Sequence, residues 1–231
     1  MTSPRVAIVT GAFGALGSAL AKSAVAQGFR VALVDRASAR PGGDWPGPET
    51  LVLGDVDLTR AEEAQRVRDA AIARFGGIDV LFNVAGAFKW ETIEDGGPDT
   101  LRDLFLVNIQ TTANCSRAMI PDLKRSGAGR IVNVGAYGAL NAAAGMGPYA
   151  ASKAGVHQLT SAMADELKGS GVTVNAVLPA IIDTPANRAG LPRADFSTWI
   201  APRDLAAIML FLASEPAGII NGALLPVTGS G

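Results

Sequence analysis

Short apolar runs alternate with segments of helical periodicity along the whole chain. The periodic segments predict helices at residues 15–28, 59–75, 99–124, 147–168 and 202–214. The apolar runs are mostly continuous, which is typical of strands that are covered on both faces. They predict seven strands, at residues 5–10, 30–35, 50–53, 78–83, 130–135, 172–178 and 223–227.

This alternation predicts an α/β protein with a Rossmann-type, doubly wound parallel sheet of about seven strands and helices on both faces. A length of 231 residues suits one domain, so we expect residues 1–231 to form a single unit. Residues 36–49 are rich in proline and glycine, and the crossover there should hold little helix. The loop-like segment 182–200 follows the carboxyl end of a strand, where ligands bind in such sheets, and is predicted to form a substrate lid.

Composition and charge narrow the class of partner. The net charge of −1 gives no electrostatic reason to expect nucleic acid or an anionic membrane. No run reaches the length of a membrane span, and three glycines interrupt the apolar start where a signal peptide would have its core. Cys115 is the only cysteine, which excludes an intramolecular disulfide and favours a reducing compartment, so we expect a cytoplasmic protein. We expect no metal site, and we expect the single histidine, His157, to be a packed helix residue.

The first apolar run leads directly into a turn with glycines at Gly11, Gly14 and Gly17, and a helix follows. Such a turn brings the backbone close to a pyrophosphate and points helix N–H groups at the anion. The strand–turn–helix context therefore favours a dinucleotide site over glycines that serve only the path of the chain.

The end of the second predicted strand carries a candidate for ribose recognition. Asp35 lies 18 residues beyond Gly17. A carboxylate there can accept hydrogen bonds from both hydroxyls of an adenosine ribose and would repel a 2′-phosphate, which favours NAD over NADP. Arg36 follows and could pair with such a phosphate, so NADP remains an alternative cofactor. A solvated Asp–Arg pair is the structural alternative.

Tyr149 and Lys153 form a candidate catalytic pair at the start of a predicted helix. A spacing of four residues puts the two side chains on one helix face, about 5–6 Å apart at Cβ. A neighbouring ammonium group should lower the phenol pKa from about 10 and make the tyrosine a usable acid or base. Asn108 falls on the apolar face of the predicted 99–124 helix. A buried amide needs partners, so it either bonds a neighbouring strand or belongs to a polar site.

These motifs occur together and in order, and on them the chain resembles the short-chain dehydrogenase/reductase family over essentially its whole length. The resemblance rests on residues 6–17, Asp57-Leu58, Asn83-Val84-Ala85-Gly86, Asn108, Tyr149 with Lys153, and residues 179–184. It implies an NAD(P)-dependent oxidoreductase with one dinucleotide-binding and catalytic domain and a small-molecule substrate. It also suggests a homodimer or homotetramer formed through the 99–124 and 147–168 helices.

The resemblance further implies a role for individual positions. Asp57 and Leu58 would contact adenine, Asn108 would help to hold a water relay to Lys153, and Tyr149 and Lys153 would be catalytic. Ile182 and Thr184 would touch the nicotinamide side. The full set of implied cofactor-binding residues is Gly11, Phe13, Gly14, Ala15, Leu16, Gly17, Asp35, Arg36, Asp57, Leu58, Asn83, Val84, Ala85, Gly86, Tyr149, Lys153, Pro179, Ile182 and Thr184.

The chain departs from the family pattern at several positions. Ala15, Val84 and Ala180 replace other small or polar residues and should leave the shape of the cofactor site unchanged. One further departure affects the catalytic chemistry. The family's catalytic serine normally lies thirteen residues before the tyrosine, and here that position is Ala136. Loss of one such hydrogen-bond donor typically costs on the order of 10²–10³ in turnover. Either the substrate is activated enough to react without the donor, or Tyr137 or a water supplies it, or the protein binds nucleotide with little turnover.

A closer resemblance to the dihydropteridine reductase branch favours the first explanation. It implies NADH-dependent reduction of a quinonoid dihydropterin by a Tyr/Lys pair without the serine, with Ala136, Tyr137, Phe196 and Trp199 near the substrate. A conventional ketone or alcohol dehydrogenase, and a nucleotide-binding redox sensor, are the alternatives. The resemblance to this branch rests on residues 14–17, Ala136, residues 155–159, Asp183-Thr184-Pro185, Asn187-Arg188, Pro192, residues 194–197 and Trp199.

Overall fold

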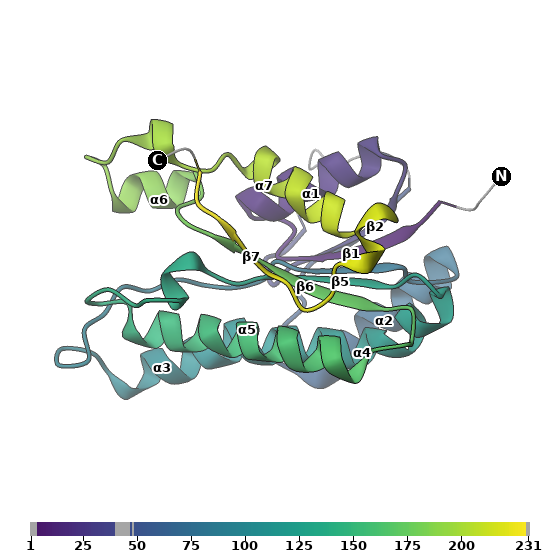
Figure 1. Ribbon diagram of the computed structural model, residues 1–231, viewed down its shortest axis with the longest axis horizontal. Helices are drawn as coiled ribbons and strands as arrows, with labels where there is room; N and C mark the ends of the chain where they lie inside the picture. The colour runs from purple at the N-terminus through teal and green to yellow at the C-terminus, as the bar shows by residue number, and fades with distance from the viewer. Residues whose placement is uncertain (1–3, 40–46, 48, 230–231) are drawn as a thin grey trace.

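The computed structural model describes residues 4–39, 47 and 49–229, which form a parallel sheet between two layers of helices (Figure 1). The strand order is β3-β2-β1-β4-β5-β6-β7, so the direction of winding reverses between β1 and β4. This confirms the predicted doubly wound parallel sheet. The strands are β1 Val6–Thr10, β2 Arg30–Val34, β3 Thr50–Leu53, β4 Val80–Asn83, β5 Arg130–Val134, β6 Thr173–Pro179 and β7 Leu224–Val227.

Helices cover both faces of the sheet, as Figure 1 shows. α1 (Ala15–Ala26) and α7 (Pro202–Leu212) pack together on one face. α2 (Ala61–Phe75), α4 (Thr111–Ser126) and α5 (Gly147–Glu166) cover the other. α3 (Pro98–Leu104) and α6 (Pro185–Gly190) are short and lie beyond the sheet. Within the described ranges, no helix combines the length and the hydropathy that a bilayer crossing requires.

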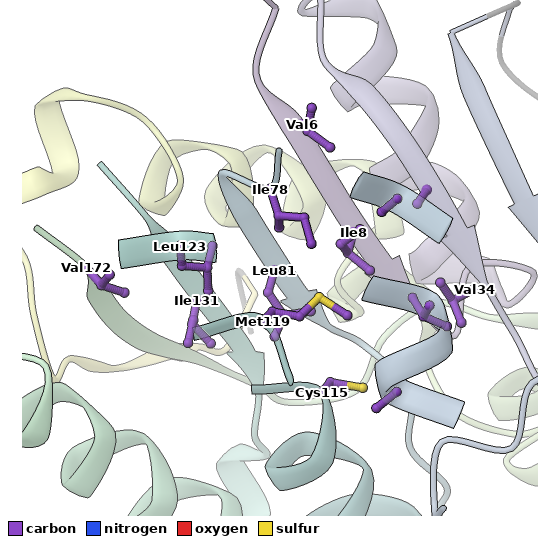
Figure 2. Packing of buried hydrophobic residues seen from close by; sticks show 14 of the residues in the cluster. Val6, Ile8, Val34, Ile78, Leu81, Cys115, Met119, Leu123, Ile131 and Val172 are labelled. Carbon is purple, nitrogen blue, oxygen red and sulfur yellow. The ribbon is translucent and has the colours of Figure 1, made fainter. Parts of the chain in front are cut away.

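The alternation of side chains along each strand builds two separate hydrophobic cores. On β1, Ile8 belongs to the cluster with Met119 and Leu123 of α4, whereas Val9 belongs to the cluster with Leu20 of α1. Figure 2 shows the first of these cores. Because both faces of the central strands β1, β4, β5 and β6 are buried, most of their positions are apolar, which explains the continuous runs in the sequence.

Cys115 lies in the first core, where Figure 2 shows it below Met119. Its side chain is fully buried, and burial raises the pKa of the thiol to about 12. A thiol with such a pKa remains protonated at neutral pH and is a poor nucleophile. The cysteine is therefore a small core residue.

The predicted helix at 99–124 is not continuous. α3 ends at Leu104, residues Phe105–Gln110 adopt a π-helical turn, and α4 begins at Thr111. A π-turn bonds i to i+5 and so shifts the faces of the helix on either side of it. Phe105 lies half exposed at the start of this turn, whereas Asn108 within it is fully buried.

The two segments predicted as loops have different outcomes. In the connection between β2 and β3, the described residues 35–39, 47 and 49 contain no helix, and the remainder of that connection lies outside the described residues. The segment 182–200 contains α6 and a 3₁₀ turn at Phe196–Thr198, so it is more regular than its prolines suggest. Thr184 caps α6 by accepting a hydrogen bond from the Asn187 N–H, and Pro185 occupies the first turn, where proline is favoured.

His157 packs α5 against the end of β5. The Ala136 N–H donates to His157 Nε2 at 3.2 Å, and the imidazole is 3% exposed. Gly135 makes room for the ring, because a Cβ on that residue would lie 2.5 Å from Nε2. Burial, and secondly the charge of Lys153, lower the pKa of His157. The neutral ring that accepts this hydrogen bond is therefore the favoured form.

This arrangement predicts a pH dependence of stability. The unfolded histidine takes up a proton near pH 6.5 and the folded one only at lower pH, so the free energy of unfolding should fall as the pH drops below about 6.5. His157→Gln has no titrating ring, and its stability should change less between about pH 7.5 and 5. Chemical denaturation across this range would measure both proteins, and parallel curves would contradict the prediction.

Candidate active site

A cleft of about 1250 Å³ runs along the carboxyl ends of the central strands. Its wall combines the turn after β1, the end of β2 and the loops after β3 and β4 with the first turns of α5. The cleft brings together most of the residues that the sequence singled out for a dinucleotide. Those that line it are Gly11, Phe13, Gly14, Ala15, Leu16, Gly17, Asp35, Arg36, Asp57, Leu58, Val84, Ala85, Gly86, Tyr149, Lys153 and Ile182.

The glycine turn requires glycine for steric reasons. Gly11 has a positive φ of 64°, and a Cβ there would lie 2.9 Å from the Ala85 backbone. A Cβ on Gly17 would lie 2.1 Å from the Gly11 carbonyl oxygen. The helix that follows has no side-chain cap on its first turn, and Gly14, Ala15 and Leu16 line the cleft. Its free N–H groups thus form the kind of site that binds a phosphate group.

Thr10 is a functional position that the sequence reasoning missed. Its hydroxyl accepts hydrogen bonds from the N–H groups of Val84 and Ala85, both at 3.0 Å, and donates to the Phe82 carbonyl at 3.3 Å. These contacts fix the loop after β4 against the glycine turn. A single hydroxyl at the end of a buried apolar strand was the signal available in the sequence.

Two carboxylates lie at the end of the cleft formed by β2 and β3. Asp35 accepts hydrogen bonds from the backbone N–H groups of Phe13 and Ala37, both at 2.9 Å. Asp57 accepts from the Thr59 hydroxyl at 2.7 Å and from its N–H at 3.1 Å. These bonds, above all the one from the Thr59 hydroxyl group, hold the pKa of Asp57 below its usual range. Both side chains are therefore fixed in position, and Asp57 is ionised at neutral pH.

Tyr149 and Lys153 lie one turn apart on α5 and both line the cleft. The ring of Tyr149 makes an edge-to-face contact with Phe88 at a centroid distance of 4.9 Å. Lys153 is buried, and its Nζ donates to the Val134 carbonyl at 2.8 Å. Burial lowers the pKa of Lys153 to about 8.

The expectation that the ammonium group lowers the phenol pKa is wrong for this structure. Burial instead raises the pKa of Tyr149 to about 12. Desolvation favours the neutral phenol, and the ammonium is engaged by the Val134 carbonyl. Tyr149 is thus a protonated group at neutral pH, able to donate a proton.

Asn108 belongs to a buried polar network, and among the described residues it bonds a loop and a helix and not a neighbouring strand. Its amide donates to the Ala87 carbonyl at 3.1 Å and accepts from the Ala87 N–H at 2.9 Å, and it also donates to the Ser152 hydroxyl at 2.9 Å. A Cβ on Gly86 would lie 2.7 Å from Asn108 Oδ1 and 3.1 Å from Lys153 Nζ. The buried amide therefore fixes the loop after β4 and stands beside the lysine, although it does not line the cleft itself.

Asn83 and Pro179 lie outside the cleft. Asn83 is buried and donates to Asn133 Oδ1 at 2.8 Å, and Asn133 in turn donates to the Thr160 hydroxyl. This chain of amides ties β4 and β5 to α5. Pro179 is the last residue of β6 and is buried there. Asn83 thus lies behind the wall of the cleft, whereas the three residues that follow it line the cleft.

The position of the missing serine is buried. Ala136 is 4% exposed and does not line the cleft. Tyr137 begins a 3₁₀ turn, is half exposed and also does not line the cleft. Among the residues that the structure describes, no three His, Cys, Asp or Glu side chains lie close enough together to hold a metal ion.

The predicted lid is held together by its own side chains. Arg188 forms a two-pronged ion pair with Asp183, at 2.6 and 2.7 Å, and its guanidinium stacks 4.7 Å from the Phe196 ring. Phe196 and Trp199 pack with their ring centroids 4.7 Å apart. Of the segment, only Ile182 lines the cleft, so Thr184, Phe196 and Trp199 lie outside it in this structure.

Comparison with known proteins places this geometry in a family. The family described as short chain dehydrogenase matches residues 5–193. The chain is 31% identical to a 3-oxoacyl-[acyl-carrier-protein] reductase of Vibrio cholerae, over 97% of this chain and 96% of the relative. It is 32% identical to a meso-2,3-butanediol dehydrogenase of Serratia marcescens, over 97% of this chain and 93% of the relative.

A solved structure has the same architecture. The crystal structure of a 3-ketoacyl-(acyl-carrier-protein) reductase from Brucella melitensis, complexed with NADH, matches with a TM-score of 0.86 and 29% identity, over 98% of this chain and 97% of that one. The seven-stranded parallel sheet agrees with this likeness in fold. The chain belongs to the short-chain dehydrogenase family.

Proposed function

We propose that this NAD(P)-dependent oxidoreductase is a reductase that prefers NADH and transfers hydride to an electron-poor C=N or C=O of the quinonoid dihydropterin type. The observation that carries the proposal is a Tyr149/Lys153 pair in the dinucleotide-shaped cleft with an alanine, Ala136, at the serine position. A carbonyl that needs strong polarisation would lose a donor there, whereas an acceptor that is already electron-poor would not.

The cleft residues fit a dinucleotide. The backbone around Gly11, Gly14 and Gly17 leaves room for a pyrophosphate against the free N–H groups of α1. Asp35, fixed by two backbone N–H groups, would accept hydrogen bonds from the adenosine ribose, and its charge supports the preference for NAD. Asp57 and Leu58 would contact adenine. When bound, the reduced cofactor supplies the hydride.

Residues on α5 would supply the proton. Tyr149, protonated at neutral pH, would donate its hydroxyl proton to the nitrogen or oxygen of the reduced bond, so that hydride and proton together complete a two-electron reduction. Lys153, released from the Val134 carbonyl, would stabilise the phenolate that remains and hold the nicotinamide ribose. Asn108 would position Lys153 through the Gly86–Ala87 backbone.

A conventional ketone or alcohol dehydrogenase is the second candidate. It is favoured by the relatives, which are named for a ketoacyl reductase and a butanediol dehydrogenase. It requires a substitute for the serine donor, either Tyr137 or a water. A redox sensor with little catalysis is the third candidate, and the intact Tyr149/Lys153 pair argues against it.

We also infer the organisation around the site. Residues 1–231 would form one dinucleotide-binding and catalytic domain, with residues 182–200 as a lid that brings Phe196 and Trp199 over the substrate. The protein would be a cytoplasmic homodimer or homotetramer formed through the α3–α4 and α5 surfaces. Leu101 and Phe105, both about half exposed on the first of these surfaces, support such a contact.

Replacing the proposed proton donor tests the mechanism. Tyr149→Phe should reduce kcat by about 10²-fold or more while leaving NADH affinity nearly unchanged, because only the transferable proton is lost. Tyr137→Phe is the matched control and should retain activity under the favoured proposal. NADH oxidation and NADH binding measure the two effects. Retained activity in Tyr149→Phe would refute the assignment, and loss in Tyr137→Phe would favour the second candidate.

Restoring the serine tests the proposed substrate class. Wild-type protein should oxidise NADH faster with a quinonoid dihydropterin than with simple ketones. Ala136→Ser should raise kcat/KM for ketones by about tenfold or more and change the dihydropterin reaction little, because only the ketone needs the additional donor. Steady-state rates with NADH and NADPH across pterin, quinone, imine and ketone acceptors measure this. Efficient ketone reduction by the wild type would support the second candidate instead.

Closing the glycine turn tests cofactor binding. The added methyl group of Gly17→Ala would meet the backbone of Gly11 and Ala12, so the turn must move and NADH affinity should fall by about tenfold or more. Gly77→Ala is the control, because nothing lies within 4 Å of its Cβ and its φ is not positive. Fluorescence titration with NADH measures both, and equal affinities would contradict the assigned pyrophosphate site.

A further inference from the structure

A second cavity opens on the opposite edge of the sheet from the cleft. It has a volume of about 380 Å³ and lies at the amino ends of β5 and β6, whose first residues are Arg130 and Thr173. β6 runs from this edge toward the lid, and Figure 1 shows α6 at the far end of the molecule. The cavity is thus separate from the dinucleotide cleft. We call it the Arg130 pocket, lined by Arg130, Lys168, Gly171, Thr173, Gly218 and Asn221 among others.

Arg130 is a buried cation without a counter-charge in the described part of the chain. Its side chain is 5% exposed, and it donates from Nε to the Ser214 carbonyl at 3.3 Å and from Nη1 to the Gly129 carbonyl at 2.9 Å. Nη2 makes no hydrogen bond and no carboxylate pairs with the guanidinium among the described residues. A buried charge is costly unless it is paired. The pocket therefore presents a positive charge with which no carboxylate of the described residues forms an ion pair.

Two buried hydroxyl groups beside this cation also lack partners. Thr173 is the register partner of Arg130 across β5 and β6, so their side chains lie on the same face of the sheet. Thr173 is only 7% exposed, and its buried Oγ1 has no hydrogen-bond partner. Ser214, whose carbonyl accepts from Arg130, also has an unbonded buried Oγ. Because buried hydroxyl groups are normally satisfied, the unbonded Thr173 hydroxyl in the same pocket as the free guanidinium nitrogen indicates a missing polar ligand.

The surroundings favour an anion as that ligand. A Cβ on Gly218 would lie 2.9 Å from Arg130 Nη2, so the glycine leaves this nitrogen accessible. Arg5 stands close enough to lower the pKa of Arg130 further, after burial itself. Lys168 lines the pocket, where it pairs with Asp165. Glu215 raises the pKa of Arg130 but makes no ion pair with it, and its side chain is exposed.

We propose that the Arg130 pocket binds a small oxyanion, a phosphate or a carboxylate, between Arg130 Nη2 and the Thr173 hydroxyl. Two donors from adjacent strands would hold two oxygens of the ligand, as charge-assisted hydrogen bonds. β5 and β6 would then be fixed at their amino ends by the anion. The carboxyl ends of the same strands carry Val134, the acceptor of Lys153, and the start of the lid segment.

Inorganic phosphate is the probe. The full chain saturated with NADH, which occupies the anion site of α1, should show a rise in Tm with millimolar phosphate above that with sodium chloride at equal ionic strength. Thr173→Val should weaken this response about tenfold, because it removes one hydrogen bond to a charged group. Valine suits a strand, and the hydroxyl makes no internal bond, so this variant should fold. Glu215→Gln should strengthen the response by removing a competing charge.

The proposal fails if the wild type shows no phosphate-specific rise. It also fails if Thr173→Val responds as the wild type does, since the hydroxyl group would then be served by water only. Gly218→Ala, which pushes a methyl group toward Nη2 without removing a polar group, should lose the response as well. The phosphate titration is repeated with the same variants in the absence of NADH. This second comparison does not depend on the proposed reductase function, so the anion pocket and the reductase function can be refuted separately.

Discussion

The burial of the parallel sheet on both faces is the constraint on which the rest of the structure depends. Because helices cover each face, the central strands are mostly apolar, and the few polar side chains inside them, such as Asn133 and Asn175, are hydrogen-bonded internally. Polar side chains that line a cavity gather at the two edges where the strands end. At the carboxyl edge lie Thr10, Asp35 and the loop after β4. At the amino edge lie Arg130 and Thr173. The same burial that stabilises the domain therefore determines where a ligand can be held.

Within the carboxyl edge, the central interaction is a buried lysine held by a backbone carbonyl. Lys153 is largely buried at the cleft wall, where it donates to the Val134 carbonyl, and burial lowers its pKa to about 8. The surrounding polar groups are equally constrained: Asn108 satisfies both polar groups of Ala87, and Gly86, which lacks a Cβ, leaves room beside it for the Asn108 amide and the Lys153 ammonium. A buried polar network of this kind is rigid because every lost bond leaves an unpaired group.

The end of β5 explains how a fold can lack the serine without losing its shape. The backbone of Ala136 is fixed by His157 from α5, independently of the side chain at 136. An alanine there keeps the strand end in place and removes only a donor. Differences in chemistry between members of such a family can thus arise from one side chain, because the backbone that presents it is held from behind.

The sequence by itself determined the features that depend on local geometry. Continuous apolar runs predicted all seven strands within one or two residues, the glycine spacing predicted the turn between β1 and α1, and a spacing of four placed Tyr149 and Lys153 together. These follow from periodicity and from backbone sterics, which are properties of neighbouring residues.

Only the tertiary structure decided what depends on contacts distant in sequence. It introduced the π-turn at Phe105–Gln110, showed Thr10 bonding the loop after β4, raised rather than lowered the pKa of Tyr149, and paired Arg130 with Thr173 across two strands. Burial and hydrogen-bond partners are set by strand register and by helices from elsewhere in the chain. No local pattern encodes them, and for that reason the protonation state of the site had to come from the fold.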